Sequence, residues 1–543
     1  MKRVIIIISV IFTVGCVTLD ENDRAHIQPN EYYRSEADLN GACITIYTGM
    51  APIQYYRLLN GMGRIQVTTD NRFAQQCRGV LTSSDQHVNQ VWTDFYQCIS
   101  KANYAIDHIL VCPVEESIKN RYIAEAKALR ALLYLRLVKL YGDMPLYMSF
   151  DTSTDDVYPA PMKEVYTTII DDLTWAAENG HEPGWKRGRM DRTGAKMVLA
   201  DAYVTCASSA AHYNPSTSAR ALKPYYTAFA DSIPFYYGHV KRITEEIISG
   251  TAYKLISSGQ WSDLWGLSES HDSRNNEEYV LSPQTIVGLY SEGHSYVPVD
   301  SEYSPAHTGI FGHVAYEHVV SYDRNDERFK QHMFSYRTIV PNNAGNYRYL
   351  QWFRDLDNPD NLLTFSGTIT FPGDPIEYRQ ARHTALYPTK FYDRTYTDPG
   401  MDGEACVIQY YRIAEAYLWF AEAENELNGM TQAAVEKINA IRERVNVPIY
   451  SEGQFTQAEF RGKLIDEYCW EFALEGKDFH VLTRFGQLEE RCKGVETTSD
   501  GTTFPGLDPN NPRPRNADNY WLPYPINEKQ LNKYMTAYRM NYE

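Results

Sequence analysis

The sequence predicts a mostly α-helical protein whose scaffold of paired helices is interrupted by one long, irregular insertion. Two blocks of the chain carry apolar residues at steps of three and four, the spacing of helices that bury one face. Glycine and proline mark short turns between those helices. The segment between the blocks, residues 259–404, is rich in Gly, Pro, Asn, Asp, Tyr and His and has only a few short strand-like runs. With 543 residues, the chain exceeds the usual size of a single core.

The N-terminus begins with Lys2 and Arg3, followed by a mostly apolar run over residues 4–12. This run is well short of the ~20 residues that a membrane-spanning helix needs, but it has the length of the apolar region in a secretory signal peptide. Cys16 follows in a Val-Gly-Cys sequence that resembles a bacterial lipobox, with Thr13 where Leu is usual. We therefore predict that Cys16 is lipidated; an ordinary signal peptide with an incidental cysteine is the alternative.

An acidic cluster, Asp20, Glu21 and Asp23, lies just after Cys16. It resembles the export signal that surface lipoproteins of Bacteroidota carry after the lipidated cysteine. A solvated acidic linker is the alternative interpretation. The first interpretation predicts display on the cell surface.

The first helical block contains the clearest helix, over residues 117–141. Its apolar stripe includes Leu129, Leu133 and Leu137, and Gly142 stands where the helix should stop. The other helices predicted for this block cover residues 91–110, 163–177, 193–209 and 243–249.

The second block predicts helices over residues 410–428, 431–445 and 456–475, with Gly429 between the first two and Pro448 after the second. Helix pairs with short connections indicate an α-solenoid of the tetratricopeptide kind. The full consensus, however, does not fit at the ~34-residue period of that repeat.

The insertion is expected to carry function, because long irregular segments in compact proteins tend to be functional loops. Its strand-like runs, 279–281 and 368–371, are short, and the tail at 494–519 also has the composition of a loop. The predicted organisation is 1–15, signal peptide; 16–30, lipidated linker; 31–258, N-terminal helical-repeat part with early ligand-side loops; 259–404, loop-rich ligand-facing insertion; and 405–543, C-terminal helical-repeat part and tail.

Charge and composition exclude some classes of partner. The formal net charge of −17 argues against binding to nucleic acid and to anionic membrane surfaces. No later segment is apolar enough to span a bilayer. The chain holds 43 Tyr, 9 Trp and 20 Phe. A tyrosine ring has an apolar face and a polar tip, which suits half-buried packing as well as recognition of a sugar or a peptide.

The cysteines other than Cys16 form no CxxC pair and no Cys/His spacing typical of zinc. Most lie in apolar helical contexts, where a free cysteine behaves as a small hydrophobe. Export would permit disulfides, but the sequence leaves their pairing open.

No catalytic motif stands out, since the sequence has no GxSxG, HExxH, phosphate-binding loop or GxGxxG. Asp355, Asp357 and Asp360 lie close together, but no glycine and no terminal glutamate complete a calcium loop. His307 and His313 share a loop that we interpret as solvated. We predict no catalytic residue, no metal and no cofactor, while calcium at the aspartates and paired acids for glycoside hydrolysis stay open.

Motif-like stretches occur in a fixed order along the chain: 125–131 with 140–146, Trp261 and Trp265 with 276–278, 411–423, 439–444, 474–477 and 522–525. In this order they resemble the EAxxLRA…LYGDxPL, W…F…NxEE, RxAEaYLxxAEA, LNxIRxRA, EGxR and LPIP motifs of the SusD/RagB family of outer-membrane nutrient-binding lipoproteins. The resemblance covers nearly the whole chain. It implies a protein that binds its ligand without cleaving it, and a SusC-like TonB-dependent outer-membrane transporter as partner.

The chain departs from the family pattern at three places. After Gly476, Asp478 to Leu482 stand where Arg-Trp-x-Asp-Leu is usual. Tyr524 replaces an Ile between two prolines, and residues 538–542 replace the usual Gln-Asn-Pro-Gly-Tyr. These departures affect the scaffold and leave the ligand open.

Charged residues of the helical motifs, Arg412, Glu415, Glu422 and Glu475, lie in helices that otherwise bury apolar faces. We interpret them as partners of helix ends and of neighbouring arginines such as Arg444. A catalytic carboxylate pair is the competing interpretation. Buried ion pairs are retained for specificity at least as often as for stability.

Ligand-binding residues are expected in loops that combine aromatic rings with bidentate polar groups, the two features that hold neutral sugars. The family resemblance implies a shallow surface formed by the early loops and the insertion. The candidates are Asp70, Asn71, Arg72, Phe73 and Gln76 in the early loop; Tyr290 and Tyr296, near His294, in the insertion; and Tyr349 and Trp352, near Tyr347, in a segment without clear periodicity. Trp352 fits a platform and a packing residue equally well. Trp92, Trp261 and Trp265 match scaffold positions of the family and are expected in the core.

With the resemblance, these features predict a lipid-anchored outer-membrane protein that faces the extracellular surface, captures a glycan and delivers it to the partner transporter. A peptide or another nutrient as ligand is the main alternative, since tyrosine-rich surfaces serve both. A surface glycosidase and a purely structural surface protein are further alternatives. The sequence leaves the sugar, its linkage and its length open.

Overall fold

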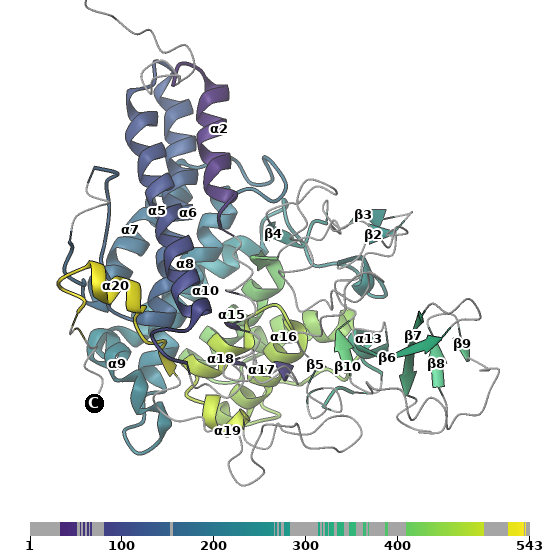
Figure 1. The fold of residues 1–543 in the computed structure, drawn as a ribbon. Helices are drawn as coiled ribbons and strands as arrows, with labels where there is room; N and C mark the ends of the chain where they lie inside the picture. Colours follow the sequence, from purple (N-terminus) through teal and green to yellow (C-terminus); the bar gives the residue numbers. More distant parts are fainter. Residues whose placement is uncertain are drawn as a thin grey trace, which may run out of the picture.

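The computed structural model describes residues 33–50, 81–151, 156–264, 276–282, 321–330, 409–492 and 520–538, apart from 324 and 537, together with single positions and short strands between these ranges. Figure 1 shows a tall group of long N-terminal helices, a group of shorter C-terminal helices beside its lower end, and a small sheet at one edge. The predicted fold class, a mostly helical scaffold with few strands in the insertion, is confirmed.

The N-terminal half contains α2 (Glu36–Tyr47), α5 (Gln86–Val111), α6 (Glu116–Tyr141), α7 (Met162–Asn179), α8 (Arg192–Ala211), α9 (Lys223–Phe229) and α10 (Ile233–Ile248). The four long helices of the prediction are confirmed with small shifts at their ends. α10 starts at Ile233, well before the predicted start at residue 243. Its early turns contain Pro234, which fits the first turn of a helix, and Gly238, so the apolar pattern is hidden there.

Helix α6 lies between α5 and α7 and is buried on most of its surface. Its apolar side chains face the core, and three charged side chains of the helix, Glu125, Arg130 and Arg136, are buried as well. The Arg130 guanidinium pairs with Asp172 at 2.8 Å and donates to the Asn103 Oδ1 at 2.7 Å. Gly142 ends the helix with a φ of 74°, a conformation that glycine adopts at low cost.

The C-terminal half contains α15 (Ile413–Asn428), α16 (Gln432–Arg444), α17 (Gln457–Glu471), α18 (Asp478–Arg484), α19 (Leu488–Cys492) and α20 (Ile526–Leu531). Helix α15 packs against α10 and α8 of the first half, so the two helical blocks share one core. Helix α17 ends at Glu471, four residues before the predicted end, because Leu474 and Gly476 adopt positive φ angles of 65° and 70°.

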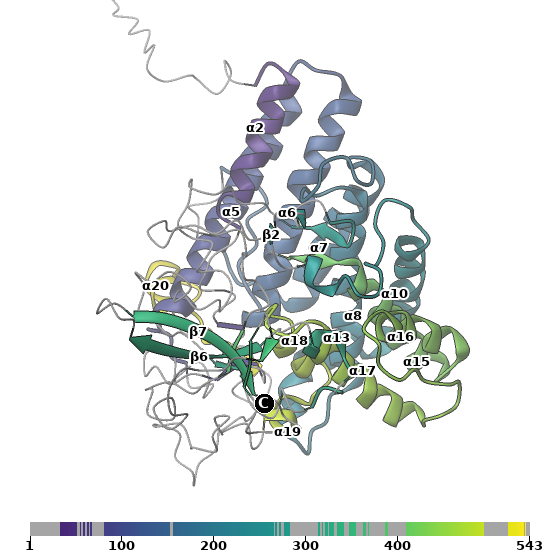
Figure 2. The same cartoon turned by 90° about the vertical axis from the view of Figure 1, so that its right-hand side faces the viewer.

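The strands come mainly from the insertion. β4 (Tyr279–Leu281), a predicted strand, pairs antiparallel with β11 (Tyr411–Arg412). A five-stranded sheet has the order β10-β6-β7-β8-β9, formed by Leu386–Pro388, Phe334–Pro341, Tyr347–Arg354, Leu362–Thr364 and Gly367–Thr368. Two small ribbons pair β1 (Gln66–Val67) with β5 (His313–Val314) and β2 (Leu267–Ser268) with β3 (His271–Asp272). Figure 2 shows β6 and β7 crossing the lower part of the molecule in front of the helices.

Strand β7 corrects one expectation. The sequence shows no clear periodicity over residues 347–352, yet these residues belong to an eight-residue strand with β6 as its antiparallel neighbour. The reason lies in its composition: Leu350 and Gln351 interrupt the alternation of aromatic and charged residues, so the period of two is not visible.

Six cysteines in the described part of the chain are buried free thiols: Cys43, Cys98, Cys112, Cys206, Cys469 and Cys492. Their expected behaviour as small core residues is confirmed. Cys77 and Cys406 lie outside the described residues.

Candidate functional site

Most residues predicted to bind ligand fall outside the part of the chain that the structure describes. These are Asp70, Asn71, Arg72, Phe73, Gln76, Tyr290 and Tyr296. The predicted lipidation site, Cys16, also lies outside the described residues. Tyr349 and Trp352 are placed by their backbone in β7, where Tyr349 pairs with Ile339 and Trp352 with Tyr336 of β6. Positions an odd number apart alternate between the faces of a strand, so a regular β7 places these two on opposite faces of the sheet.

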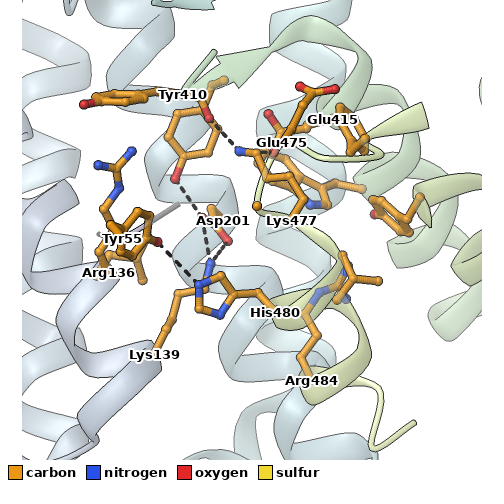
Figure 3. A pocket seen from close by; sticks show the side chains of 17 residues that line it. Tyr55, Arg136, Lys139, Asp201, Tyr410, Glu415, Glu475, Lys477, His480 and Arg484 are labelled. Carbon is orange, nitrogen blue, oxygen red and sulfur yellow. Dashed lines mark hydrogen bonds and ion pairs between the residues drawn. The ribbon is translucent and has the colours of Figure 1, made fainter. Parts of the chain in front are cut away.

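A polar cavity of about 60 Å³ lies among the described residues, where the N-terminal and C-terminal helices meet (Figure 3). Its walls come from α6, α8, α15, α17 and α18, and Tyr55 closes one side. The charged and titratable residues that line it include Arg136, Lys139, Asp201, Glu415, Glu475, Lys477, His480 and Arg484.

Asp201 organises one wall of this cavity. Its two oxygens accept hydrogen bonds from the Lys139 Nζ at 2.9 and 3.0 Å, and Oδ2 also accepts from the Tyr411 hydroxyl at 2.7 Å. Burial disfavours a charged carboxylate, but the Lys139 ammonium outweighs burial and holds the pKa of Asp201 at about 2. Burial also lowers the pKa of Lys139, against the attraction of Asp201.

The opposite wall comes from α18 and the turn before it. Lys477 forms an ion pair with Glu415 at 2.9 Å and donates to the Tyr410 carbonyl oxygen at 2.6 Å. The His480 Nε2 lies 3.4 Å from the Tyr55 hydroxyl oxygen. Burial, reinforced by nearby cations, lowers the pKa of His480 well below its usual value, so the imidazole is neutral at pH 7.

The cavity is too small for a sugar. A water molecule needs at least ~10–15 Å³, whereas a cavity of ~150 Å³ takes up benzene. A volume of about 60 Å³ therefore holds a few waters and no pyranose ring. Sequence reasoning missed this cluster, although Lys139 and Asp201 each interrupt an apolar helical stretch, a pattern that indicates a buried ion pair.

A second buried network joins the insertion to the C-terminal helices. Arg412 is fully buried and pairs with Glu278 at 2.5 Å, with Glu471 at 2.9 Å and with Glu475 at 2.8 Å. Arg444 pairs with Glu278 and Glu471 as well. Since Glu278 precedes β4, its ion pairs with Arg412 and Arg444 connect the start of the insertion to β11 and α16.

Arg328 connects a later part of the insertion to α17. Its guanidinium pairs with Asp326 at 2.7 Å, with Glu467 at 2.7 Å and with Glu471 at 3.1 Å. Burial disfavours the charge of Glu471, but Arg444 and the other two guanidinium groups outweigh burial and hold its pKa at about 2. A carboxylate held in this way is neither a general acid at neutral pH nor an open nucleophile.

The structural interpretation of the motif charges is therefore confirmed for the pairs that the structure describes. Glu422 pairs with Arg484 and accepts a hydrogen bond from the Tyr468 hydroxyl at 2.9 Å, and Glu415 pairs with Lys477. Each of these carboxylates of α15 has a cationic partner from α18 or from the turn before it.

The predicted core tryptophans Trp92 and Trp261 are confirmed, with 4% and 1% of their surfaces exposed. Trp92 packs edge-on against Tyr141 and Tyr524, at ring-centroid distances of 4.9 and 6.1 Å. Trp265 lies outside the described residues.

Two departures from the family pattern have a visible structural role. The Tyr524 hydroxyl donates to the Asp143 carbonyl oxygen at 2.7 Å, so the tyrosine ties the tail to the turn after α6. Asp478 is buried against Gly63: a Cβ at Gly63 would lie 2.1 Å from the carboxylate, so a larger residue there would require the Asp478 side chain to move.

Within the described ranges, no group of three or more His, Cys, Asp or Glu side chains is placed to hold a metal ion. The predicted calcium alternative at Asp355, Asp357 and Asp360 lies outside those ranges. None of the described helices is both long and apolar enough to cross a membrane.

Known proteins resemble this chain in sequence and in fold. The family model described as "SusD family" matches residues 259–542, and one described as "Starch-binding associating with outer membrane" matches residues 25–179. SusD-like protein P2 of Formosa agariphila is 24% identical over 503 residues, which cover 89% of this chain and 90% of that protein.

Two solved structures illustrate the likeness in fold. A SusD-like carbohydrate binding protein from Bacteroides vulgatus has a TM-score of 0.67 at 16% identity, covering 93% of this chain and 98% of its own. A laminarin binding SusD-like protein has a TM-score of 0.62 at 20% identity, covering 92% and 98%. The first family model alone spans more than half of the sequence. The chain therefore belongs to the SusD/RagB family.

Proposed function

We propose that this protein is a non-catalytic glycan-binding lipoprotein of the outer-membrane surface, which captures an oligosaccharide or polysaccharide and delivers it to a SusC-like TonB-dependent transporter. The observation that carries the proposal is the match over about nine-tenths of the chain to proteins described as carbohydrate binding. The buried carboxylates of Asp201, Glu415, Glu422 and Glu471 support a binding role, because each of them is paired with a lysine or an arginine.

The ligand face is proposed to lie on the early loop and the insertion. The cavity between the helices is too small for a sugar, and the Arg412 and Arg328 networks fix two parts of the insertion to the scaffold. A rigid base under the insertion would keep an aromatic platform preorganised, which lowers the entropy lost on binding.

Trp352 and Tyr296 are the proposed stacking residues, and Asp70 and Arg72 the proposed hydrogen-bonding residues. Trp352→Ala should weaken glycan binding about ten- to hundred-fold without lowering the melting temperature, since an exposed platform supports no core. Trp261→Ala is the matched control: that ring is buried, so its loss should destabilise the fold. Unfolding of Trp352→Ala would instead identify Trp352 as a packing residue.

Tyr349→Ala sharpens this test, because positions 349 and 352 fall on opposite faces of a regular β7. A ligand on one face should respond strongly to one substitution and weakly to the other. Equal, large losses from both would contradict a single ligand face on this sheet.

The proposed anchor is Cys16. Cys16→Ala should release the protein from the membrane fraction, because the lipid on this cysteine is the proposed tether. Continued sedimentation of the variant with outer membranes that lack the transporter would contradict the anchor.

Surface display is proposed to depend on Asp20, Glu21 and Asp23. Alanine at all three positions should leave the protein lipidated but facing the periplasm. Protease added to whole cells measures this: the wild type should be cleaved and the variant protected. Equal cleavage of both would count against the acidic cluster as an export signal.

The partner is proposed to contact the helical-repeat side of the protein. Extraction in mild detergent should therefore recover the protein together with a TonB-dependent barrel. Recovery of the protein alone, under conditions in which related pairs stay together, would contradict the partnership. A hydrolysis assay on any glycan that binds separates this proposal from a surface glycosidase.

A further inference from the structure

Two exposed tyrosines meet on the flank of the molecule that carries α20. Tyr158, in the connection between α6 and α7, has 61% of its surface exposed, and Tyr534, just after α20, has 42% exposed. Their ring centroids lie 5.8 Å apart at an angle of 71°. Among the described tyrosines, Tyr226 is the other exposed one, at 47%, and the rest are half-buried or buried.

The two rings stand on a rigid base. Tyr538 lies 5.9 Å from Tyr158 and 5.9 Å from Tyr524, which in turn packs on the core residue Trp92. The Tyr538 hydroxyl donates to the Asp143 Oδ2 at 2.7 Å. A line of aromatic contacts therefore connects the exposed tyrosines to the buried end of α5.

Hydrogen bonds hold the two chain segments together beneath the rings. The Asn532 Nδ2 donates to the Val157 carbonyl oxygen at 3.0 Å, and the Asn532 Oδ1 accepts from the Tyr534 backbone N–H at 3.0 Å. Asn532 is buried, with 4% of its surface exposed. The segment before α7 and the segment after α20 thus form one surface.

Exposed charges border the rings. Lys533 and Asp156 form an ion pair at 3.4 Å with 65% and 35% of their side chains exposed. The Lys533 Nζ also lies 4.9 Å from the centre of the Tyr534 ring. An exposed pair of this kind contributes little to stability, so both groups remain available for a ligand.

We propose that Tyr158, Tyr534, Asp156 and Lys533 form a second carbohydrate-contact surface. This inference rests on the proposed glycan-binding function and extends it to a surface made of described residues. Preorganised aromatic rings offer apolar faces to the C–H groups of a sugar at little entropic cost, and the carboxylate and ammonium groups fit its hydroxyls. The alternative ligand is a protein. Leu531, at the end of α20, is 80% exposed, and an exposed apolar side chain would favour a protein contact.

The surface is separate from β6 and β7, the part of the proposed ligand face that the structure describes. Figure 1 places α20 at the opposite side of the helices from β6 and β7. A long glycan held at one side, or a second chain of the same polymer, can therefore be retained at the other. Linked binding events raise the apparent affinity for a polymer more than for a short oligosaccharide.

The test compares migration of the lipid-free protein in native gels that contain soluble starch or laminarin, together with a panel of other soluble glycans. Tyr158→Ala with Tyr534→Ala should reduce retardation by the polymer that the wild type binds, by roughly threefold to tenfold per ring. Tyr158→Phe should keep most of the retardation, because the stacking face remains. Leu531→Ala, at a more exposed position on the same flank, should leave it unchanged.

The outcomes separate this inference from the proposed function. Retardation of the wild type together with equal retardation of the double variant would overturn the second surface and leave the glycan-binding proposal standing. Failure of every glycan to retard the wild type would overturn both. If the double variant and Leu531→Ala instead lose a co-purifying membrane protein while glycan retardation is unchanged, the surface binds protein and the inference is wrong. Melting temperatures of all variants confirm that they are folded.

Discussion

The interior of the C-terminal helices and the flank around α20 use polar and aromatic residues in opposite ways. In the interior, Arg412 and Glu471 are each surrounded by several partners and have no exposed surface. On the flank, Tyr158 and Tyr534 are held at their base and keep much of their surface free. Groups that are fully engaged within the chain stabilise the fold but offer nothing to a ligand, whereas groups that are positioned but uncovered can bind one.

The cavity between the two helical blocks combines features of the interior and the flank. Lys139, Lys477 and Arg484 are each paired with a carboxylate, as in the Arg412 network, yet about 60 Å³ of space remains beside them. This space is large enough for a few water molecules, which would screen the charges, so we expect each pair here to contribute less to stability than a pair in the Arg412 network.

The largest expected effect comes from the interior network. Glu471→Gln should destabilise the protein by about 3–5 kcal/mol, because it leaves Arg412, Arg444 and Arg328 short of a buried counter-charge. Chemical denaturation measures the change. Glu443→Gln, at an exposed position of α16, is the matched control and should have almost no effect. If the two variants were equally stable, the buried network would contribute no more to stability than an exposed residue does, and the interior would not differ from the flank.

The next effect concerns the hydrated cavity. Asp201→Asn should cost about 2 kcal/mol, since it leaves the buried Lys139 ammonium without its carboxylate. Combining it with Lys139→Met should recover part of the loss, which a double-mutant cycle would report as coupling between the two residues. Strict additivity of the two substitutions would mean that they do not interact.

A smaller loss of stability is expected at acidic pH. The pKa of His480 is depressed in the folded state below its unfolded value of 6.5, so below pH 6.5 the unfolded chain binds a proton that the folded chain does not. Stability should therefore fall as the pH drops below about 6.5. Melting temperatures between pH 7.5 and 5 measure this slope. His480→Gln should flatten it, and an unchanged slope would show that other groups carry it.

The smallest effect on stability is expected on the flank. Tyr158→Ala and Tyr534→Ala should each change the free energy of unfolding by about 0.5 kcal/mol or less, as is usual for exposed residues away from core contacts. A loss comparable to that of Glu471→Gln would show that the tyrosines are structural, and the flank would no longer differ from the interior.

The scaffold was predictable from sequence because its signals are local. The stripe of α6, the stop at Gly142 and the core positions of Trp92 and Trp261 follow from periodicity, turn chemistry and motif order. The pairing of Arg412 with glutamates was expected in kind, but its actual partners Glu278 and Glu471 come from distant segments that only the fold brings together.

The candidate site was less predictable, because its residues come from distant segments that only the fold brings together. Tyr158 and Tyr534 are far apart in sequence, and nothing in the neighbourhood of either residue indicates that their rings meet. Strand β7 was hidden because Leu350 and Gln351 break its alternation. Asp70, Arg72 and Tyr296 remain predictions, since they lie outside the described residues.

A glycan array probed with the lipid-free protein, followed by a hydrolysis assay on every glycan retained, tests the central claim most directly. The account predicts binding to at least one class of oligosaccharide or polysaccharide, with the bound glycan recovered intact. Retention of no glycan, retention of peptides instead, or cleavage of the bound glycan would contradict it.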